Sequence, residues 1–447
     1  MSTPKQIEAN CMDSTKSSGP CKAEQFRTFG EIFPGLCFEV VTDPRKPETL
    51  QQHACSGTRF WTSSEIERGE RIYVPATIDY SLNQVVRFPC PSVEFESPAK
   101  LIGSMTDCFC NFGGTPKEDS DLLAAWAVST WFVDCFRAAP VLHVTGSVVR
   151  MHLIMRLLDC MCRRPILLGR LDLSALSTLP KGLGATLLVH DGKLSKNVAH
   201  ALNASRNRNI SVPIGRNLIH AYGAKVLFSN PTSVSESDLR IHLASPAGVL
   251  PDLSDDAERT MAAEFQGKLL RYRMVNFNAV RDSNFEFGEV DPAMQDDARS
   301  LLTPLIDCGD LRASILSSLL SRSKEVAGAR LTDLDCLVVE AALCFCHDPS
   351  KDAFFVQELA DVVNAILLGR HEERTTTSKA VGQALRGLGL AAERVTKGYR
   401  IDLTNSNREK IHRLAGEHDV PSIKDGIQRC DHCHRRDDPV SELRTGI

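Results

Sequence analysis

Apolar residues along the middle of the chain gather in short runs that are separated by stretches with helical spacing. The runs read as strands, since each is only three or four residues long and almost wholly apolar. Buried strands that alternate with helices predict a parallel sheet with both faces covered. The strands are expected at 141–144, 166–168, 186–189 and 225–228, with helices that include 153–162 and 197–204.

The regions on either side have different patterns. Residues 26–115 are expected to form a small β-rich domain with strands at 36–41, 59–62, 71–74 and 84–88. Residues 119–136 follow an acidic start and are apolar nearly all round, which predicts a buried helix.

Helical spacing returns after the predicted sheet. The clearest helices are expected at 257–270 and 297–320, followed by an apolar stretch at 338–345. The expected order of domains is a disordered terminus (1–25), the β-rich domain (26–115), an α/β core (119–250), a helical domain (255–350), a further small domain (352–420) and a polar tail (421–447).

Composition agrees with an ordinary globular protein. Of the 447 residues, 43% are hydrophobic and 24% are charged, and the net charge is −4. The longest uncharged apolar run is too short to span a membrane, and residues 1–24 lack the apolar core of a signal peptide. We therefore expect a cytoplasmic protein that has no membrane contact and whose 16 cysteines are mostly reduced, buried thiols.

The first strand of the predicted sheet is followed by Gly146 and an apolar helix, which is the layout of a phosphate-binding loop. Such a loop needs a second glycine, a lysine for the β- and γ-phosphates and a hydroxyl for Mg²⁺. Counted from Gly146, these three positions hold Met151, His152 and Leu153. The loop therefore lacks the residues that bind phosphate.

The strand at 186–189 should end in the aspartate that holds Mg²⁺. Its first following residue is His190, and an acid appears only at Asp191. A neutral imidazole is a poor Mg²⁺ ligand, since this ion prefers oxygen.

Several segments give the chain a resemblance to a known fold. They are 124–126, 130–131, 162–169, 179–180, 185–189 and 222–226. With these segments, residues 120–245 resemble the P-loop NTPase core of additional-strand, helicase-like ATPases of phage- and plasmid-type replication proteins, in particular a poorly characterised bacterial group. The resemblance implies a γ-phosphate sensor at Asn230 and a trans-acting arginine at Arg240. The degenerate nucleotide-site positions are then Gly146, Arg150, Met151, His152, His190, Asp191, Asn230 and Arg240.

Three interpretations of this core stay open. Gly146 is an ordinary turn glycine of an unrelated α/β domain, or the fold derives from a P-loop ATPase that has lost hydrolysis, or ATP and Mg²⁺ still bind through Arg150, His152 and Asp191 in unusual roles. The second is favoured, because losing the lysine and the metal acid together removes most charge stabilisation of the transition state. No catalytic residue is assigned.

Residues 355–367 and 379–388 have helical spacing, and 392–403 has the pattern of a hairpin with a glycine turn. This order predicts a winged helix-turn-helix. From Arg374 to Arg400 there are six basic residues and one acid, so DNA is the expected partner, with protein contact or a solvated basic surface as alternatives. The residues expected to face DNA are Ser378, Lys379, Gln383, Arg386, Arg394, Lys397, Tyr399 and Arg400.

Two weaker signals complete the chain. The basic run 193–216 could carry a nucleic-acid loop or be a solvated surface. Cys430, Cys433 and His434 have the spacing of part of a zinc site, although an unliganded tail is slightly favoured.

Three functions follow from these patterns. The first is a non-hydrolysing, P-loop-derived protein that binds DNA or joins a DNA-associated assembly. The second is an ATP-dependent helicase- or primase-associated enzyme with an atypical site. The third is a scaffold in which the core forms a ring as a homo-oligomer.

Overall fold

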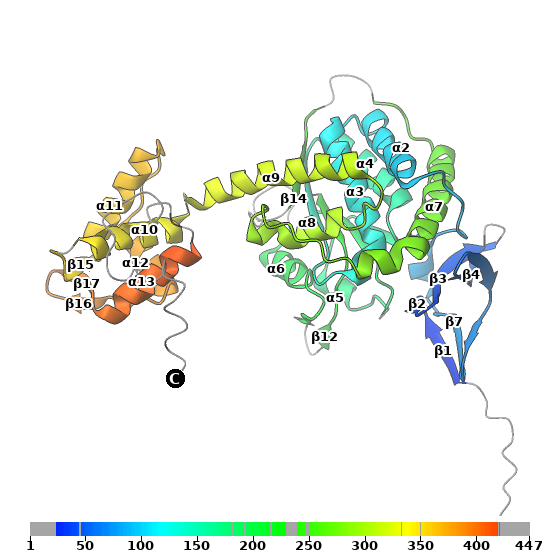
Figure 1. Ribbon diagram of the computed structural model, residues 1–447, viewed down its shortest axis with the longest axis horizontal. Coiled ribbons are helices and arrows are strands. Elements are labelled where there is room, and N and C mark those ends of the chain that lie inside the picture. The colour runs from blue at the N-terminus through cyan, green and yellow to red at the C-terminus, as the bar shows by residue number, and fades with distance from the viewer. Residues whose placement is uncertain are drawn as a thin grey trace, which may run out of the picture. The chain divides into compact units, whose positions relative to one another are not determined.

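A computed structural model describes residues 24–43, 46–180, 182–191, 194–214, 217–228, 239–245, 250–331, 333–348, 350–418 and 420. The chain divides into two compact units (Figure 1). The first unit comprises Met1–Gly288 and Ala293–Ser318, and the second comprises Glu289–Pro292 and Leu319–Ile447.

The first unit contains a five-stranded, all-parallel sheet in the order β14-β8-β13-β10-β9. The protein therefore belongs to the mixed α/β class, and the predicted parallel sheet is confirmed. Each predicted strand lies within one of its strands, which are β8 (Val141–Gly146), β9 (Pro165–Leu168), β10 (Thr186–His190), β13 (Lys225–Phe228) and β14 (Leu239–Leu243).

Both faces of this sheet are covered because its apolar side chains alternate between two sets of helices. Val141, Leu187 and Leu227 belong to one apolar cluster with Val198 and Leu202 of the helix α6. The helix α4 packs against β8, β9 and β10, and also contacts the longest helix of this unit, α7. The bounds of these elements are α4 (Val148–Met161), α5 (Leu173–Leu176), α6 (Lys196–Ala204) and α7 (Asp255–Arg281), and a hairpin of β11 (Val212–Ile214) and β12 (Asn217–Ile219) follows α6.

The apolar segment before β8 is buried, as its composition predicts. It forms α3 (Lys117–Ser129) and the 3-10 helix η1 (Thr130–Cys135), and it packs against α2 (Pro98–Asn111). The side chains of Trp126 and Trp131 are fully buried.

The N-terminal residues form two small sheets. The first has the order β2-β3-β4-β5 and is antiparallel, and in the second β1 and β6 flank β7. Their strands are β1 (Glu24–Thr28), β2 (Gly30–Phe33), β3 (Leu36–Asp43), β4 (Lys46–Ser56), β5 (Arg59–Ser63), β6 (Ile66–Arg68) and β7 (Arg71–Pro75).

Two predictions for the first unit are wrong. The strand expected at 84–88 is replaced by a helix, α1 (Tyr80–Val85), because the Asp79 carboxylate accepts a hydrogen bond from the Leu82 N–H at 2.7 Å and caps it. Only Val86 of that stretch makes a strand-like bridge, to Ile166.

The single helix expected at 297–320 is two helices. Pro304 lacks an amide hydrogen, and Asp307 has a φ of 56°, so the helix cannot continue through them. The helices of this region are η2 (Pro292–Met294), α8 (Gln295–Leu302) and α9 (Gly309–Leu331).

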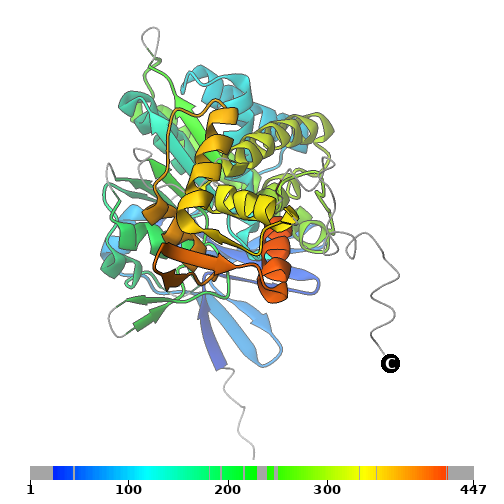
Figure 2. The same cartoon turned by 90° about the vertical axis from the view of Figure 1, so that its left-hand side faces the viewer.

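The second unit consists of helices around a three-stranded antiparallel sheet in the order β15-β17-β16 (Figure 2, yellow to red). Its apolar core includes Val339, Leu359 and Ile411, which are buried. The elements are α10 (Leu334–His347), β15 (Ala353–Phe355), α11 (Val356–Gly369), α12 (Ser378–Gly387), β16 (Glu393–Val395), β17 (Gly398–Asp402) and α13 (Asn405–Glu417). Within the described part of the chain, no helix has both the length and the apolarity to cross a membrane.

Candidate functional site

The turn after β8 is closed by the neighbouring strand β14. Gly146 has a φ of 105°, which favours glycine, and a Cβ atom there would lie 2.1 Å from the Leu243 carbonyl oxygen. The Ser147 N–H donates to that same oxygen at 2.8 Å. Since α4 begins at Val148, Ser147 is the sole residue between β8 and the helix.

The side chains that follow Gly146 point in different directions. Met151 is buried in the core. Arg150 extends toward Gly114, since its Nη2 lies 3.4 Å from the position that a Cβ of Gly114 would take. Its Nε is buried without an acceptor among the residues that the structure describes.

Two predicted residues do meet at the carboxyl edge of the sheet. The ring of His152, on α4, contacts the ring of His190, at the end of β10, edge-on, with 4.8 Å between centroids. Asp191 follows and is half-buried. Across the described ranges, no three histidine, cysteine or acidic side chains gather as a metal site would require.

Of the two remaining positions predicted for this site, the structure describes only Arg240. Arg240 is exposed on β14, and in the register of the sheet it lies opposite His143 of β8. Asn230 lies outside the described residues, as do Cys430, Cys433 and His434.

The predicted DNA-facing residues lie on α12 and on the hairpin of β16 and β17. The helix α12 is capped by the Thr377 hydroxyl, which accepts from the Ala380 N–H at 3.3 Å. Val381 and Leu385 are buried, so the opposite face of α12 is exposed. The exposed residues are Lys379, Gln383, Arg386, Arg394, Lys397, Tyr399 and Arg400, and Ser378 is half-buried.

The turn before α12 is fixed by an amide side chain. Asn364 of α11 accepts from the Thr376 N–H at 2.7 Å and donates to the Thr376 carbonyl oxygen at 3.1 Å. On the hairpin, Arg400 forms an ion pair with Asp402 at 2.5 Å, so part of its charge is already compensated.

A group of buried charges lies in the first unit, and the sequence pattern did not reveal it. The Glu39 carboxylate, on β3, accepts from Arg163 at 2.6 Å and from Arg273 at 2.8 Å, and it also binds Arg164. Arg273 forms a second ion pair, with Asp134 at 2.5 Å. Burial works to raise the pKa of Glu39, but the three arginines hold it below its usual value.

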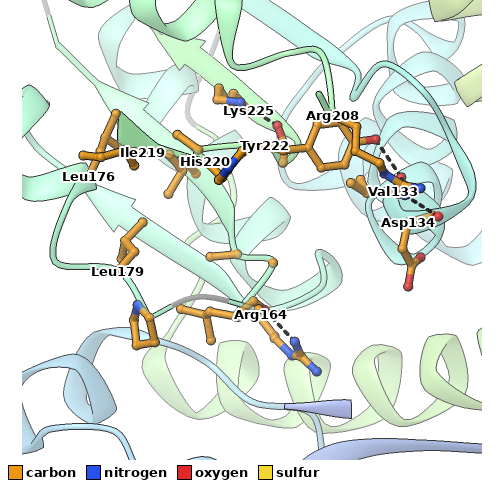
Figure 3. A pocket seen from close by; sticks show the side chains of 18 of the residues that line it. Val133, Asp134, Arg164, Leu176, Leu179, Arg208, Ile219, His220, Tyr222 and Lys225 are labelled. Carbon is orange, nitrogen blue, oxygen red and sulfur yellow. Dashed lines mark hydrogen bonds between the residues drawn. The ribbon is translucent and has the colours of Figure 1, made fainter. Parts of the chain in front are cut away.

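Next to this charge cluster lies a pocket of about 840 Å³, shown in Figure 3. It opens at the amino ends of β9, β10 and β13, because Arg163 and Arg164 precede β9, Gly184 and Ala185 precede β10, and Tyr222 and Gly223 precede β13. The predicted nucleotide site is at the carboxyl ends of the same sheet. The pocket is therefore a separate site.

Lys225 is the first residue of β13 and lines this pocket. Its side chain is fully buried, and its Nζ donates to the carbonyl oxygens of Gly223, at 2.7 Å, and Ser205, at 3.3 Å. Burial, together with the charge of Arg206, lowers the pKa of Lys225 to about 7. The one sequence signal for this residue is a lysine that opens an otherwise apolar strand.

No protein-family model and no curated protein matches this chain. Among solved structures, the apo C-terminal region of NrS-1 overlaps with 83% of this chain and 97% of that one, at 10% identity and a TM-score of 0.33. A full-length MCM homolog from Methanopyrus kandleri overlaps with 62% of this chain and 75% of that one, at 12% identity and a TM-score of 0.34.

Drosophila ORC bound to DNA overlaps with 72% of this chain and 95% of that one, at 12% identity and a TM-score of 0.20. Overlaps with TM-scores this low do not define a function.

Proposed function

We propose that this chain is a non-hydrolysing, P-loop-derived protein that binds DNA through a winged helix in its second unit. The proposal has three parts, which are the origin of the core, the loss of its chemistry and the surface that contacts DNA.

The origin of the core is supported by its strand order. The strand β13 lies between β8, which leads to the glycine turn, and β10, which leads to His190 and Asp191. An inserted strand at this place is the feature for which additional-strand P-loop folds are named. A glycine turn and a helix also follow β8 directly, as they do in that class.

The loss of hydrolysis is supported by the geometry of the turn. A phosphate-binding loop uses several backbone amides that converge on one anion. Here the turn has one residue, Ser147, and its amide is bonded to Leu243. The position of the phosphate-binding lysine holds His152, whose ring contacts His190. These observations favour a core that lacks both the backbone amides that bind a triphosphate and the lysine that polarises it.

Isothermal titration with ATP and Mg²⁺ tests this part, together with a phosphate-release assay. We expect no saturable heat and no release above the buffer rate. A one-to-one titration curve, or turnover that His152→Ala removes, contradicts the proposed loss of chemistry and favours the atypical ATPase.

The observation that carries DNA binding is the exposed face of α12. Lys379, Gln383 and Arg386 share this face, while Val381 and Leu385 hold the helix on the core. No ion pair with an acid is recorded for Lys379 or Arg386 in the described residues. Long cations without an acid partner, next to an amide side chain, suit contacts to phosphates and base edges in the major groove.

The neighbouring hairpin extends the same basic surface. Arg394 on β16, Lys397 in the turn and Tyr399 on β17 are all exposed. The two-way hydrogen bonds of Asn364 with Thr376 hold α12 in a fixed relation to α11. A preformed helix and wing lose little conformational entropy on binding, which favours a stable complex.

Fluorescence polarisation with a labelled duplex tests DNA binding in the full chain. Lys379→Ala and Arg386→Ala should each weaken binding, and each should reduce the slope of log K against log salt concentration by about 0.9. The matched control is Arg413→Ala, an exposed arginine on α13 that pairs with Glu417 at 3.6 Å. The proposal fails if no salt-dependent binding is seen, or if all three variants bind DNA as the wild type does.

A further inference from the structure

The pocket at the amino edge of the parallel sheet has two chemically different sides. Leu176, Leu179 and Ile219 form an apolar side, with Leu176 buried and the other two half-buried. Figure 3 shows Tyr222 and Arg208 across the cavity from Leu176 and Leu179. A volume of about 840 Å³ is within the range of small-molecule sites, which are commonly apolar with a few placed polar groups.

The charges around this pocket do not balance. The arginines of its lining are Arg163, Arg164 and Arg208, and the first two share Glu39 with Arg273. Lys225, with a pKa of about 7, also lines the pocket, and the acid of the lining is Asp134. The acid is already bound by Arg273, which lies outside the lining. The pocket therefore has a surplus of positive charge.

Part of that surplus is directed toward the cavity. Arg163 uses Nη2 to bind Glu39, but its Nε is buried without an acceptor in the described residues. Its Nη1 lies 3.5 Å from the position that a Cβ of Gly184 would take, and Gly184 lines the pocket. A buried guanidinium with an unused donor is costly unless an acceptor completes it.

Arg208 supplies an exposed cation at the rim. Its guanidinium carbon lies 5.3 Å from the centre of the Tyr222 ring, and its Nη2 donates to the backbone carbonyl oxygens of Asp134 and Val133. The Tyr222 hydroxyl in turn donates to the Val133 carbonyl oxygen at 2.8 Å. These contacts hold the guanidinium in place before any ligand arrives, which reduces the entropy cost of binding.

We propose that this pocket binds a small organic anion, with its apolar body against Leu176, Leu179 and Ile219 and its charged group on the side of Arg163 and Arg208. Lys225 also lines the pocket, but its side chain is buried and its Nζ donates to backbone carbonyl oxygens, so the arginines carry the charge that the ligand meets. The apolar side favours a compact ligand over a nucleic-acid strand, because a strand needs a continuous row of cations along its backbone. The site is independent of the proposed DNA surface, which belongs to the second unit.

A pair of fluorescent probes tests the proposal with the full chain. The anionic probe is 8-anilinonaphthalene-1-sulfonate, and its neutral partner is N-phenyl-1-naphthylamine, which has the same rings without the sulfonate. We expect the anionic probe to saturate one site, to bind about tenfold more tightly than the neutral probe, and to weaken as salt is raised.

Two variants locate the binding. Arg208→Gln should weaken the anionic probe about fivefold and leave the neutral probe unchanged, as expected for losing one exposed charge. The matched control is Arg59→Gln, an exposed arginine that lies 5.6 Å from the Trp61 ring centre and is not part of the pocket. A normal circular-dichroism spectrum of each variant excludes misfolding.

The second variant adds a charge at the rim. Leu218 is 72% exposed, so Leu218→Glu leaves the fold intact and should repel the anionic probe alone. Its control is Leu368→Glu in the second unit, at a residue that is 75% exposed. The proposal is overturned if the anionic probe does not saturate, if both probes bind equally, if the pocket variants match their controls, or if a single-stranded oligonucleotide displaces the probe.

Discussion

The substitution Lys225→Met offers a quantitative test of the charge balance at the amino edge of the sheet. Methionine has a similar length and no charge, so the packing of β13 should survive. Both proteins keep the remaining charges of the pocket. The property to compare is the pH dependence of stability, because the loss of two hydrogen bonds to carbonyl oxygens also changes the stability itself.

The size and sign of the effect follow from the pKa of Lys225. Its usual value is 10.5, and burial lowers it to about 7 in the folded protein. Between these values the unfolded chain holds one more proton than the folded chain. The free energy of unfolding therefore rises with pH, by about 1.4 kcal/mol per pH unit. The whole pKa shift corresponds to a destabilisation of the folded protein by about 5 kcal/mol. This destabilisation is absent above the unfolded pKa of 10.5 and fully present below pH 7.

Urea unfolding followed by tryptophan fluorescence gives the required numbers. All three tryptophans, Trp61, Trp126 and Trp131, belong to the first unit, so the signal reports the unit that contains Lys225. Between pH 7 and 9 the wild type should gain about 2 kcal/mol relative to Lys225→Met. Cysteines with raised pKa values are common to both proteins, and their effects cancel in the difference.

A matched control and a clear failure complete this test. Lys100→Met changes an exposed lysine of α2, whose side chain is 69% exposed, and should leave the pH slope of the wild type unchanged. If the wild type and Lys225→Met have parallel stability curves from pH 7 to 9, Lys225 is not a buried titrating group. The lowered pKa that burial gives this lysine is then refuted.

Two further substitutions test the structure around each edge of the sheet. Glu39→Gln should lower the stability of the first unit by about 3–5 kcal/mol in the same urea assay, since it leaves buried guanidinium groups without their shared carboxylate. The control Glu65→Gln, at an exposed position, should stay within about 0.5 kcal/mol, and equal values for the two would contradict the cluster. Gly146→Ala should yield insoluble or strongly destabilised protein, because its Cβ would meet the Leu243 carbonyl oxygen. Gly169→Ala, where no atom lies within 4 Å, should be nearly neutral, and soluble, fully stable Gly146→Ala would disprove the closed turn.

The parallel sheet could be predicted because its strands are buried on both faces, which leaves short apolar runs that stand out from the surrounding helices. The edge strand β14 was not assigned as a strand. Its sequence Leu239-Arg240-Ile241-His242-Leu243 alternates between buried and exposed residues, and this period of two is a readable signal of a half-covered strand. Arg240 was instead interpreted through its resemblance to a trans-acting arginine.

The wrong predictions have local physical causes. The apolar residues at 84–88 suggested a strand, but the cap at Asp79 starts a helix just before them. The stretch 297–320 has helical spacing throughout, and only the backbone at Pro304 and Asp307 reveals the break. The sequence signal that indicates this break is Pro304, which lies within the apolar helical pattern.

The charge cluster and its pocket could not be predicted from sequence patterns. Glu39 and Asp134 lie far from Arg163 and Arg273 along the chain, and they meet through tertiary packing alone. Each residue taken singly is typical of a solvated surface. Arg163 and Arg164 are adjacent in a segment that carries the resemblance to helicase-like ATPases, and that resemblance implies no role for either.

The lengths of the connections explain why the two edges of the sheet differ. At the carboxyl edge, β8 passes into α4 through one residue, and β14 fills the neighbouring space, so the backbone amides bond within the protein. At the amino edge, the strands β10 and β13 are reached through long connections that contain α5 and the hairpin of β11 and β12. The cavity at this edge is lined by more basic than acidic residues, and two of its arginines share Glu39. If the core derives from a nucleotide-binding ancestor and the pocket binds an anion as we propose, anion binding has moved from one edge of the sheet to the other.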